Sequence, residues 1–310
     1  MTEAIEVRGL VKRYGQLAAV DGIDFSVSSG TVFSFLGPNG AGKTTTTEIL
    51  EGLRRRTGGE VSVLGLDPWT EGPALHRRIG VIPQDFRFFE KITAGEAIEY
   101  YRALFHTDVD PDVLLAQVEL LDKKNARYDT LSGGQKQKLG LALALTNVPE
   151  ICFLDEPTTG LDPHARRAIW SVIRSLKGSG KTIFLTTHYL EEAELLADHV
   201  AIIHHGKIIA AGTPSEIIRV HGRPERISVQ APPELATYLE THLGVAASAE
   251  DGRVAVELGD KHDALRVLSA IEASGFPWDS FETNRDTLED VFVRMVGQMD
   301  DGALKQEAPK

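Results

Sequence analysis

Residues 37–44 read Gly37-Pro-Asn-Gly-Ala-Gly-Lys-Thr44, which matches the pattern G-x-x-x-x-G-K-[ST] of a phosphate-binding loop. The apolar run VFSFL precedes this loop at 32–36, and the helix-compatible stretch TTTTEILEGL follows from Thr44. Glycines let backbone N–H groups turn inward around a phosphate, and the start of a helix adds positive potential. A strand, a loop and a helix in this order predict an α/β fold with a phosphate site at the end of a buried strand.

The loop assigns a role to each of its polar residues. Lys43 is expected to reach the β- and γ-phosphates of a nucleotide, and the Thr44 hydroxyl is expected to ligate Mg²⁺. The residues predicted to contact the nucleotide here are Gly37, Pro38, Asn39, Gly40, Ala41, Gly42, Lys43, Thr44 and Thr45.

Two carboxylates end the apolar run Ile151-Cys-Phe-Leu154. Asp155 and Glu156 should lie at the carboxyl edge of a buried strand, where sites form in open α/β sheets. Asp155 is suited to hold Mg²⁺ through water, and Glu156 to accept a proton from an attacking water molecule. The alternative is that Glu156 only caps the turn that follows with Pro157.

A second predicted anion site is Leu131-Ser-Gly-Gly-Gln135, which precedes the helical stretch KQKLGLALALTN. A serine and two glycine amides would stand at a helix N-terminus. By itself this is an ordinary N-cap, since serine is a favoured capping residue.

Apolar runs at Ile183–Thr187 and Val200–Ile203 predict further buried parallel strands.

Together these motifs resemble the ATP-binding subunit of ABC (ATP-binding cassette) transporters, across about residues 3–220. Order and spacing also agree for Val81-Ile-Pro-Gln84, Gly160-Leu-Asp162 and Thr187-His188. The resemblance implies a P-loop NTPase fold with a RecA-like core, an antiparallel β subdomain and a helical subdomain. It implies an ATP-binding domain at 1–222. Within it, the capping box Thr93-Ala-Gly-Glu96 opens a predicted helix through Arg102, and Asp110-Pro111 starts another, which suggests a helical insert at about 87–147. The resemblance also implies a homodimer in which each ATP is clamped between one copy's phosphate-binding loop and the other's Ser132, Gly133, Gly134 and Gln135.

The resemblance carries further roles residue by residue. Tyr14 corresponds to the aromatic residue that stacks on adenine, although it could be a packed strand tyrosine. Gln84 corresponds to the glutamine that senses Mg²⁺ and γ-phosphate, or is a plain loop residue. His188 would orient water and polarise the γ-phosphate, or is a lone core histidine. Asp162 would contact the partner's loop, or is a simple turn residue. The chain departs from the pattern at Lys138, where the family often has arginine. The planar guanidinium of arginine, which donates several hydrogen bonds in a fixed geometry, is here replaced by the compact ammonium group of lysine.

Asp85-Phe-Arg-Phe-Phe89 places three aromatic residues where the helical insert begins. Such a cluster is seldom exposed without a partner. In the family this region receives a helix of the membrane subunit, so Phe86, Phe88 and Phe89 are candidates for docking. The alternative is that they cover the core of the insert.

The C-terminal part differs in charge. Residues 1–224 hold 28 acidic and 25 basic residues (net −3), whereas 225–310 hold 17 and 8 (net −9). Gly222-Arg-Pro224 interrupts regular structure, and alternating strand and helix patterns predict a βαββαβ, ferredoxin-like regulatory or dimerisation domain at 225–298, with a flexible tail at 299–310. Gly206–Pro214 and Leu288-Glu-Asp-Val-Phe292 resemble exporters of the daunorubicin-resistance type, although the second motif could be an ordinary helix start.

Composition narrows the function. A net charge of −12 argues against a broad nucleic-acid surface. There is no signal-peptide pattern, and no apolar run approaches the roughly 20 residues that cross a bilayer. The single Cys152 lies in an apolar run and favours a core role in a reducing compartment.

The favoured function is an exporter's ATPase subunit at the cytoplasmic face of the membrane, held there by a permease. The alternatives are a soluble ABC ATPase acting on ribosomes or DNA and, less well supported, a small-molecule kinase.

Overall fold

The computed structural model describes residues 2–259 and 263–306. The chain divides into two compact units, residues 1–214 and 215–310. The division falls after the first residue of helix α8 (Pro214–His221), whereas the sequence pattern placed the boundary near Gly222. The reason is that the end of α8 is bonded to the C-terminal region: Arg294 donates to the His221 carbonyl, and the Arg223 N–H donates to Asp286.

The larger sheet of the first unit has six strands in the order β5-β6-β7-β3-β8-β9. Neighbouring strands are parallel, except that β8 and β9 are antiparallel. All five residues of β3 are buried, as predicted for a parallel strand covered on both faces. The strands are β3 Val32–Leu36, β5 Ile79–Ile82, β6 Ile151–Asp155, β7 Thr182–Thr187, β8 His199–His204 and β9 Lys207–Gly212.

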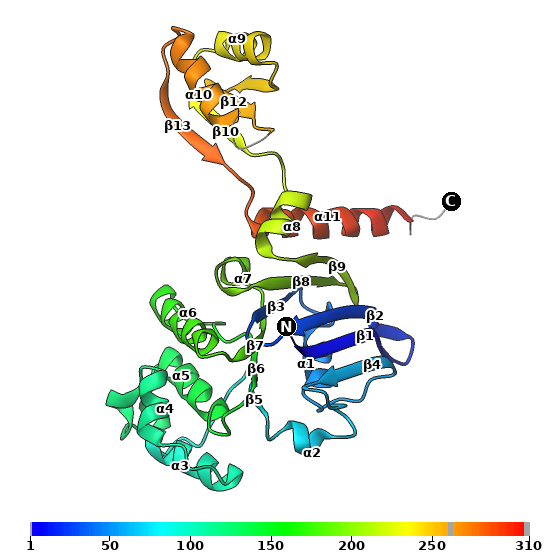
Figure 1. The fold of residues 1–310 in the computed structure, drawn as a ribbon, viewed down its shortest axis with the longest axis vertical. Helices are drawn as coiled ribbons and strands as arrows, with labels where there is room; N and C mark the ends of the chain where they lie inside the picture. Colours follow the sequence, from blue (N-terminus) through cyan, green and yellow to red (C-terminus); the bar gives the residue numbers. More distant parts are fainter. Residues whose placement is uncertain (1, 260–262, 307–310) are drawn as a thin grey trace. The chain divides into compact units, whose positions relative to one another are not determined.

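A second sheet of the first unit is antiparallel, in the order β2-β1-β4. Its strands are β1 Glu3–Tyr14, β2 Leu17–Ser28 and β4 Gly58–Val63. Figure 1 shows this sheet on one side of the parallel strands β5, β6 and β7, with helices α3, α4, α5 and α6 on the other side. A parallel core, an antiparallel sheet and a group of helices form the mixed α/β fold predicted from the sequence.

Capping residues set the starts of the helices. Thr93 and Glu96 form the predicted capping box of α3, and Asp110 caps α4 with Pro111 in the first turn. α3 extends to Phe105, three residues beyond its expected end, because His106 in a left-handed conformation closes it. The helices of this unit are α1 Lys43–Leu50, α2 Gly72–Leu75, α3 Ala94–Phe105, α4 Pro111–Gln117, α5 Gly133–Ala144, α6 Pro163–Gly178 and α7 Leu190–Leu196.

Two apolar clusters lie on the faces of the parallel sheet. One joins the sheet to α3, α4, α5 and α6, and the other joins it to α1 and the antiparallel sheet. Cys152 lies in the first cluster, and burial raises the pKa of its thiol to about 12, so this residue is an inert core side chain. Within the described ranges, no helix is long and apolar enough to span a membrane.

The second unit contains a four-stranded antiparallel sheet in the order β11-β12-β10-β13. This strand order, with one helix after β10 and one after β12, is the βαββαβ arrangement expected from the sequence. The elements are β10 Arg226–Gln230, α9 Glu234–Leu243, β11 Ala247–Glu250, β12 Arg253–Glu257, α10 Asp263–Ala273, β13 Asp279–Asn284 and α11 Leu288–Gln306.

Two predicted segments extend beyond the described residues. The strand and helix patterns after residue 225 predict a helix that starts at Lys261, and α10 is described from Asp263, since 260–262 lie outside the described residues. The tail expected at 299–310 overlaps α11, which continues through Gln306, and 307–310 also lie outside the described residues. The apolar core of this unit is formed by β10, β12, α9 and α10.

Candidate functional site

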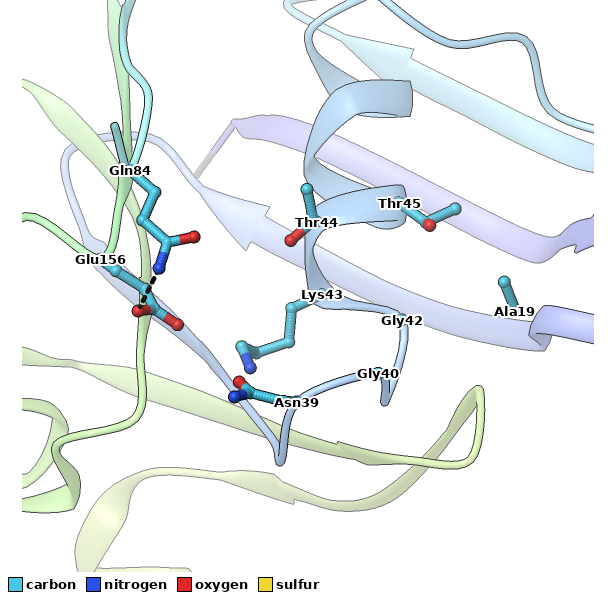
Figure 2. A pocket seen from close by; sticks show the side chains of 9 residues that line it. All are labelled: Ala19, Asn39, Gly40, Gly42, Lys43, Thr44, Thr45, Gln84 and Glu156. Atoms are coloured by element: carbon cyan, nitrogen blue, oxygen red, sulfur yellow. Dashed lines mark hydrogen bonds between the residues drawn. The ribbon is translucent and has the colours of Figure 1, made fainter. Parts of the chain in front are cut away.

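The phosphate-binding loop, which connects β3 to α1, borders a cavity of about 330 Å³. Two glycines give the loop its path. A Cβ on Gly37 would lie 2.3 Å from the Ile203 carbonyl oxygen, and Gly42 has φ 113°, a left-handed value that disfavours other residues. Six of the nine loop residues predicted to contact a nucleotide line the cavity, together with Ala19 of β2 and with Gln84 and Glu156, which follow β5 and β6 (Figure 2). Its lining is Ala19, Asn39, Gly40, Gly42, Lys43, Thr44, Thr45, Gln84 and Glu156.

Lys43 extends along the loop beneath this cavity. Its ammonium donates to the Gly37 and Pro38 carbonyl oxygens at 2.7 and 3.3 Å. Ala41, which is buried, donates its N–H to the Pro38 oxygen and completes the turn. Burial lowers the pKa of Lys43, while the carboxylates of Glu156 and Asp155 raise it. A lysine held by carbonyl oxygens is ready to exchange them for more strongly charged phosphate oxygens.

Glu156 is the centre of the polar groups opposite the loop. Its Oε2 accepts hydrogen bonds from Gln84 Nε2 at 3.0 Å and Thr159 Oγ1 at 3.0 Å, and it lies 3.1 Å from His188 Nδ1. These residues come from the ends of β5, β6 and β7 and the loop after β6, so the parallel sheet brings them to one edge. The structure therefore groups Glu156, Gln84 and His188, which the sequence presented far apart.

Asp155 lies beside this group and accepts a short hydrogen bond from the Thr186 hydroxyl. Burial and the neighbouring Glu156 raise its pKa, while the Thr186 bond and Lys43 lower it. In Figure 2 the Gln84 amide oxygen and the Thr44 hydroxyl point toward one another across the cavity.

The predicted magnesium ligands fit a site that nucleotide completes. Asp155, Thr44 and Gln84 provide a carboxylate, a hydroxyl and an amide oxygen, all of which suit a hard cation. No group of three or more His, Cys, Asp or Glu side chains in the described part of the chain is placed to enclose a metal ion. Mg²⁺ usually binds through one or two carboxylates plus phosphates and water, so this sparse set is the expected protein share.

Ser132 and Asp162 border a different cavity, of about 340 Å³, which shares no lining residue with the first. Ser132 caps α5 in a reciprocal box with Gln135, and Asp162 caps α6 by accepting from the Ala165 N–H at 2.9 Å. Gly134 also lines this cavity, and Gly133 forms the first residue of α5. Within one copy the structure does not bring these residues to the phosphate-binding loop.

Tyr14 lies at the end of β1, is 41% exposed and does not line the cavity of the loop. Lys12 and Arg54 lie over its ring, at 5.0 and 5.5 Å from the ring centre. The ring is therefore an accessible aromatic surface in a cationic environment rather than a packed core residue. Lys138, the departure noted above, forms one ion pair with Glu119 at 2.8 Å.

The aromatic cluster after Gln84 separates into two parts. Phe86 and Phe88 are half-buried against the helical cluster, with rings 6.1 and 6.4 Å from that of Tyr128. Phe89 is 66% exposed. Phe86 and Phe88 therefore help to cover the core of the insert, and Phe89 is the exposed member of the three; docking of a membrane subunit here stays a prediction.

Sequence reasoning did not identify three residues at the site, Ala19, Thr159 and Thr186. Thr159 and Thr186 are adjacent to recognised motifs, since Thr159 precedes Gly160-Leu-Asp162 and Thr186 precedes Thr187-His188. A search for hydroxyl groups next to the carboxylates would have found them. Ala19 has no chemical signal, because only the packing of β2 brings it to the loop.

Comparison with known proteins gives consistent similarities. A family model described as ABC transporter matches residues 20–159. The chain is 38% identical over 315 residues to the daunorubicin resistance ATP-binding protein DrrA3 of Streptomyces coeruleorubidus, covering 98% of this chain and 99% of that protein. It is 37% identical over 300 residues to a fluoroquinolones export ATP-binding protein of Mycobacterium tuberculosis, covering 96% and 94%.

A solved structure is similar in fold to about two thirds of this chain. It is a dimeric ATP-binding cassette in a post-hydrolysis state bound to ADP and Pi, with a TM-score of 0.59 and 25% identity. The similarity covers 67% of this chain and 98% of that one.

Proposed function

This chain belongs to the family of ABC transporter ATP-binding subunits, and we propose that two copies hydrolyse ATP at a head-to-tail interface to drive a separate membrane permease. The names of its relatives, which refer to daunorubicin resistance and fluoroquinolone export, support a drug, an antibiotic or another hydrophobic compound as the cargo. The permease would hold the subunit at the cytoplasmic face of the membrane, and no nucleic acid takes part.

The observation that carries this proposal is the convergence of Gln84, Thr159 and His188 on one oxygen of Glu156. With nucleotide in the cavity, Glu156 is the group that accepts a proton from the attacking water. His188 orients that water and polarises the γ-phosphate, and Lys43 neutralises the phosphate oxygens. Thr44, Asp155 and Gln84 would hold Mg²⁺, which would supply charge stabilisation to the transferred phosphoryl group.

The separate cavity of Ser132 supports a composite site. A helix N-terminus favours an anion, and the α5 N-terminus carries Ser132 and two glycine amides. Because this cavity shares no residue with the phosphate-binding loop, its serine would reach a γ-phosphate bound by a second copy. Asp162 lines the same cavity, which agrees with a contact to the partner's loop.

Glu156→Gln tests the assignment of the base. The variant keeps the shape of the side chain but cannot accept the proton, so ATP turnover should fall by about 10² to 10⁴-fold. Binding of ATP should persist, and the variant should accumulate as an ATP-bound dimer on size-exclusion chromatography with Mg-ATP. Turnover near the wild-type rate would refute the assignment.

Mixed dimers test the composite site. When a Lys43→Ala subunit is combined with a Ser132→Arg subunit, one site receives both defects and the other receives neither. Activity should therefore exceed that of either variant alone. The same low activity in heterodimers confirmed by two affinity tags would contradict action of Ser132 in trans.

A further inference from the structure

Glu192 is a buried carboxylate that the proposed mechanism does not use. It lies in α7 and is fully buried. Its Oε1 accepts from Trp170 Nε1 at 2.9 Å, and its Oε2 accepts from Thr158 Oγ1 at 3.2 Å. A buried charge is costly unless it is hydrogen-bonded. Glu192 therefore connects α6, α7 and the loop after β6 through bonds that the fold retains.

The connection to Thr158 is significant because of the backbone of Glu156, two residues earlier. Glu156 has φ 47°, in the left-handed region that is unfavourable for a residue with a Cβ. Pro157 follows it, and the residue before a proline prefers an extended conformation. Such a backbone conformation persists only when the surrounding structure enforces it, and residues in such conformations are concentrated at functional sites.

The contacts around Glu156 identify what holds it. On the preceding side, its N–H donates to the Thr186 carbonyl oxygen at 3.0 Å and is 3.1 Å from the Thr186 hydroxyl. On the following side, the Thr159 N–H donates to the Glu156 carbonyl oxygen at 3.2 Å. The next link is the Thr158 hydroxyl, which joins this turn to Glu192.

We propose that Glu192 is a positioning residue for ATP hydrolysis: by holding Thr158, it keeps the Glu156 backbone left-handed and its Oε2 beside Gln84 and His188. The inference rests on the proposed function, in which Glu156 is the base. Because Glu192 lies in the helix that starts two residues after His188, one carboxylate fixes both segments that contact the attacking water.

The competing explanation is that Glu192 has a purely structural role, because its bond from Trp170 already connects α6 to α7. Two variants separate the roles because each removes one hydrogen bond from the same carboxylate. Thr158→Val removes the hydroxyl with little change of shape and breaks the link to the Glu156 turn. Trp170→Phe removes the indole N–H and breaks the link to α6. Glu191→Gln, an exposed neighbour in α7, is the matched control.

The measurement is steady-state ATP turnover by the purified full chain with Mg-ATP, with rates normalised to nucleotide-binding stoichiometry. Thr158→Val should lower kcat by about 10 to 100-fold, since a shift near 1 Å in a reacting group can cost that much. Its KM should stay within about threefold, because substrate contacts are unchanged. Thr158→Ser should restore kcat, and Trp170→Phe should lower thermal stability while keeping kcat within about threefold of the control.

Further outcomes distinguish the claims. Glu192→Ala and the double variant Glu192→Ala/Thr158→Val should have the same kcat, since the first substitution already breaks the bond between Thr158 and Glu192. Equal loss of kcat in Thr158→Val and Trp170→Phe, or an unchanged kcat in Thr158→Val, would overturn the positioning role while Glu156→Gln remained inactive. If Glu156→Gln itself turned over ATP normally, the proposed function would fail first.

Discussion

Glu51 provides a quantitative test of the folded core of the first unit. It follows the last residue of α1, is 5% exposed, and lines a largely apolar cavity with Ile79, Tyr101 and Leu143. Burial raises the pKa of Glu51 from its ordinary 4.5 to about 8, with added repulsion from Asp155 and Glu48. Its side chain has no hydrogen-bond partner among the residues that the structure describes.

The sign of the effect follows from proton binding. Between pH 4.5 and about 8, the folded protein holds a proton on Glu51 that the unfolded chain releases. The contribution of Glu51 to the free energy of unfolding is therefore most favourable to the folded state below pH 4.5, and it decreases as the pH rises to about 8. Each unit of pKa shift corresponds to about 1.4 kcal/mol. The shift of the Glu51 pKa from 4.5 to about 8 therefore lowers the free energy of unfolding by at most about 5 kcal/mol at high pH. Relaxation and water entry reduce such penalties, and we expect a loss of about 2–4 kcal/mol.

Glu51→Gln removes the ionisation while keeping the size of the side chain. Urea unfolding at intervals from pH 5 to 9, without nucleotide, should show a shallower pH dependence for this variant. We subtract the free energy of unfolding of the parent from that of the variant at each pH. This difference should be about 2–4 kcal/mol larger at pH 8.5 than at pH 5. A Trp278→Phe background leaves Trp69 and Trp170 to report fluorescence from the first unit.

Glu60→Gln, at an exposed position of β4, is the control and should follow the parent at every pH. If Glu51→Gln and the parent had the same pH dependence, Glu51 would ionise freely in the folded state. The burial argument would then be refuted.

Four other perturbations have defined outcomes. Phe88→Ala should lower the free energy of unfolding by about 2 kcal/mol or more in calorimetry, because its ring packs against the helical cluster. Phe89→Ala should leave that value within about 0.5 kcal/mol and weaken copurification with the permease; the reverse pattern would place docking elsewhere. Deletion of residues 215–310 should leave ATP affinity within about threefold by titration calorimetry, since the lining of the nucleotide cavity lies in the first unit; loss of binding by a folded product would contradict this. Gly80→Ala should destabilise the chain by about 1–3 kcal/mol, since its Cβ would lie 2.1 Å from the Ala144 carbonyl oxygen, and an unchanged melting temperature would count against this contact.

Local patterns in the sequence were enough to predict several elements of this protein. The loop 37–44 and the apolar run before it identified β3 and α1, because glycine conformations and strand burial depend mainly on nearby residues. The capping box of Thr93 and Glu96 also acts within four residues. Alternating strand and helix patterns after residue 225 likewise predicted the elements of the second unit.

Tertiary packing decided which of several similar residues does what. The run Glu191-Glu-Ala-Glu194 contains three glutamates, and only packing against Trp170 and Thr158 makes Glu192 the buried one. Phe86, Phe88 and Phe89 look alike in sequence, but their burial depends on Tyr128, about 40 residues away. The left-handed backbone of Glu156 depends on Thr186, from a different strand. Burial, and the charges and conformations it enforces, arises from long-range contacts that no local pattern contains.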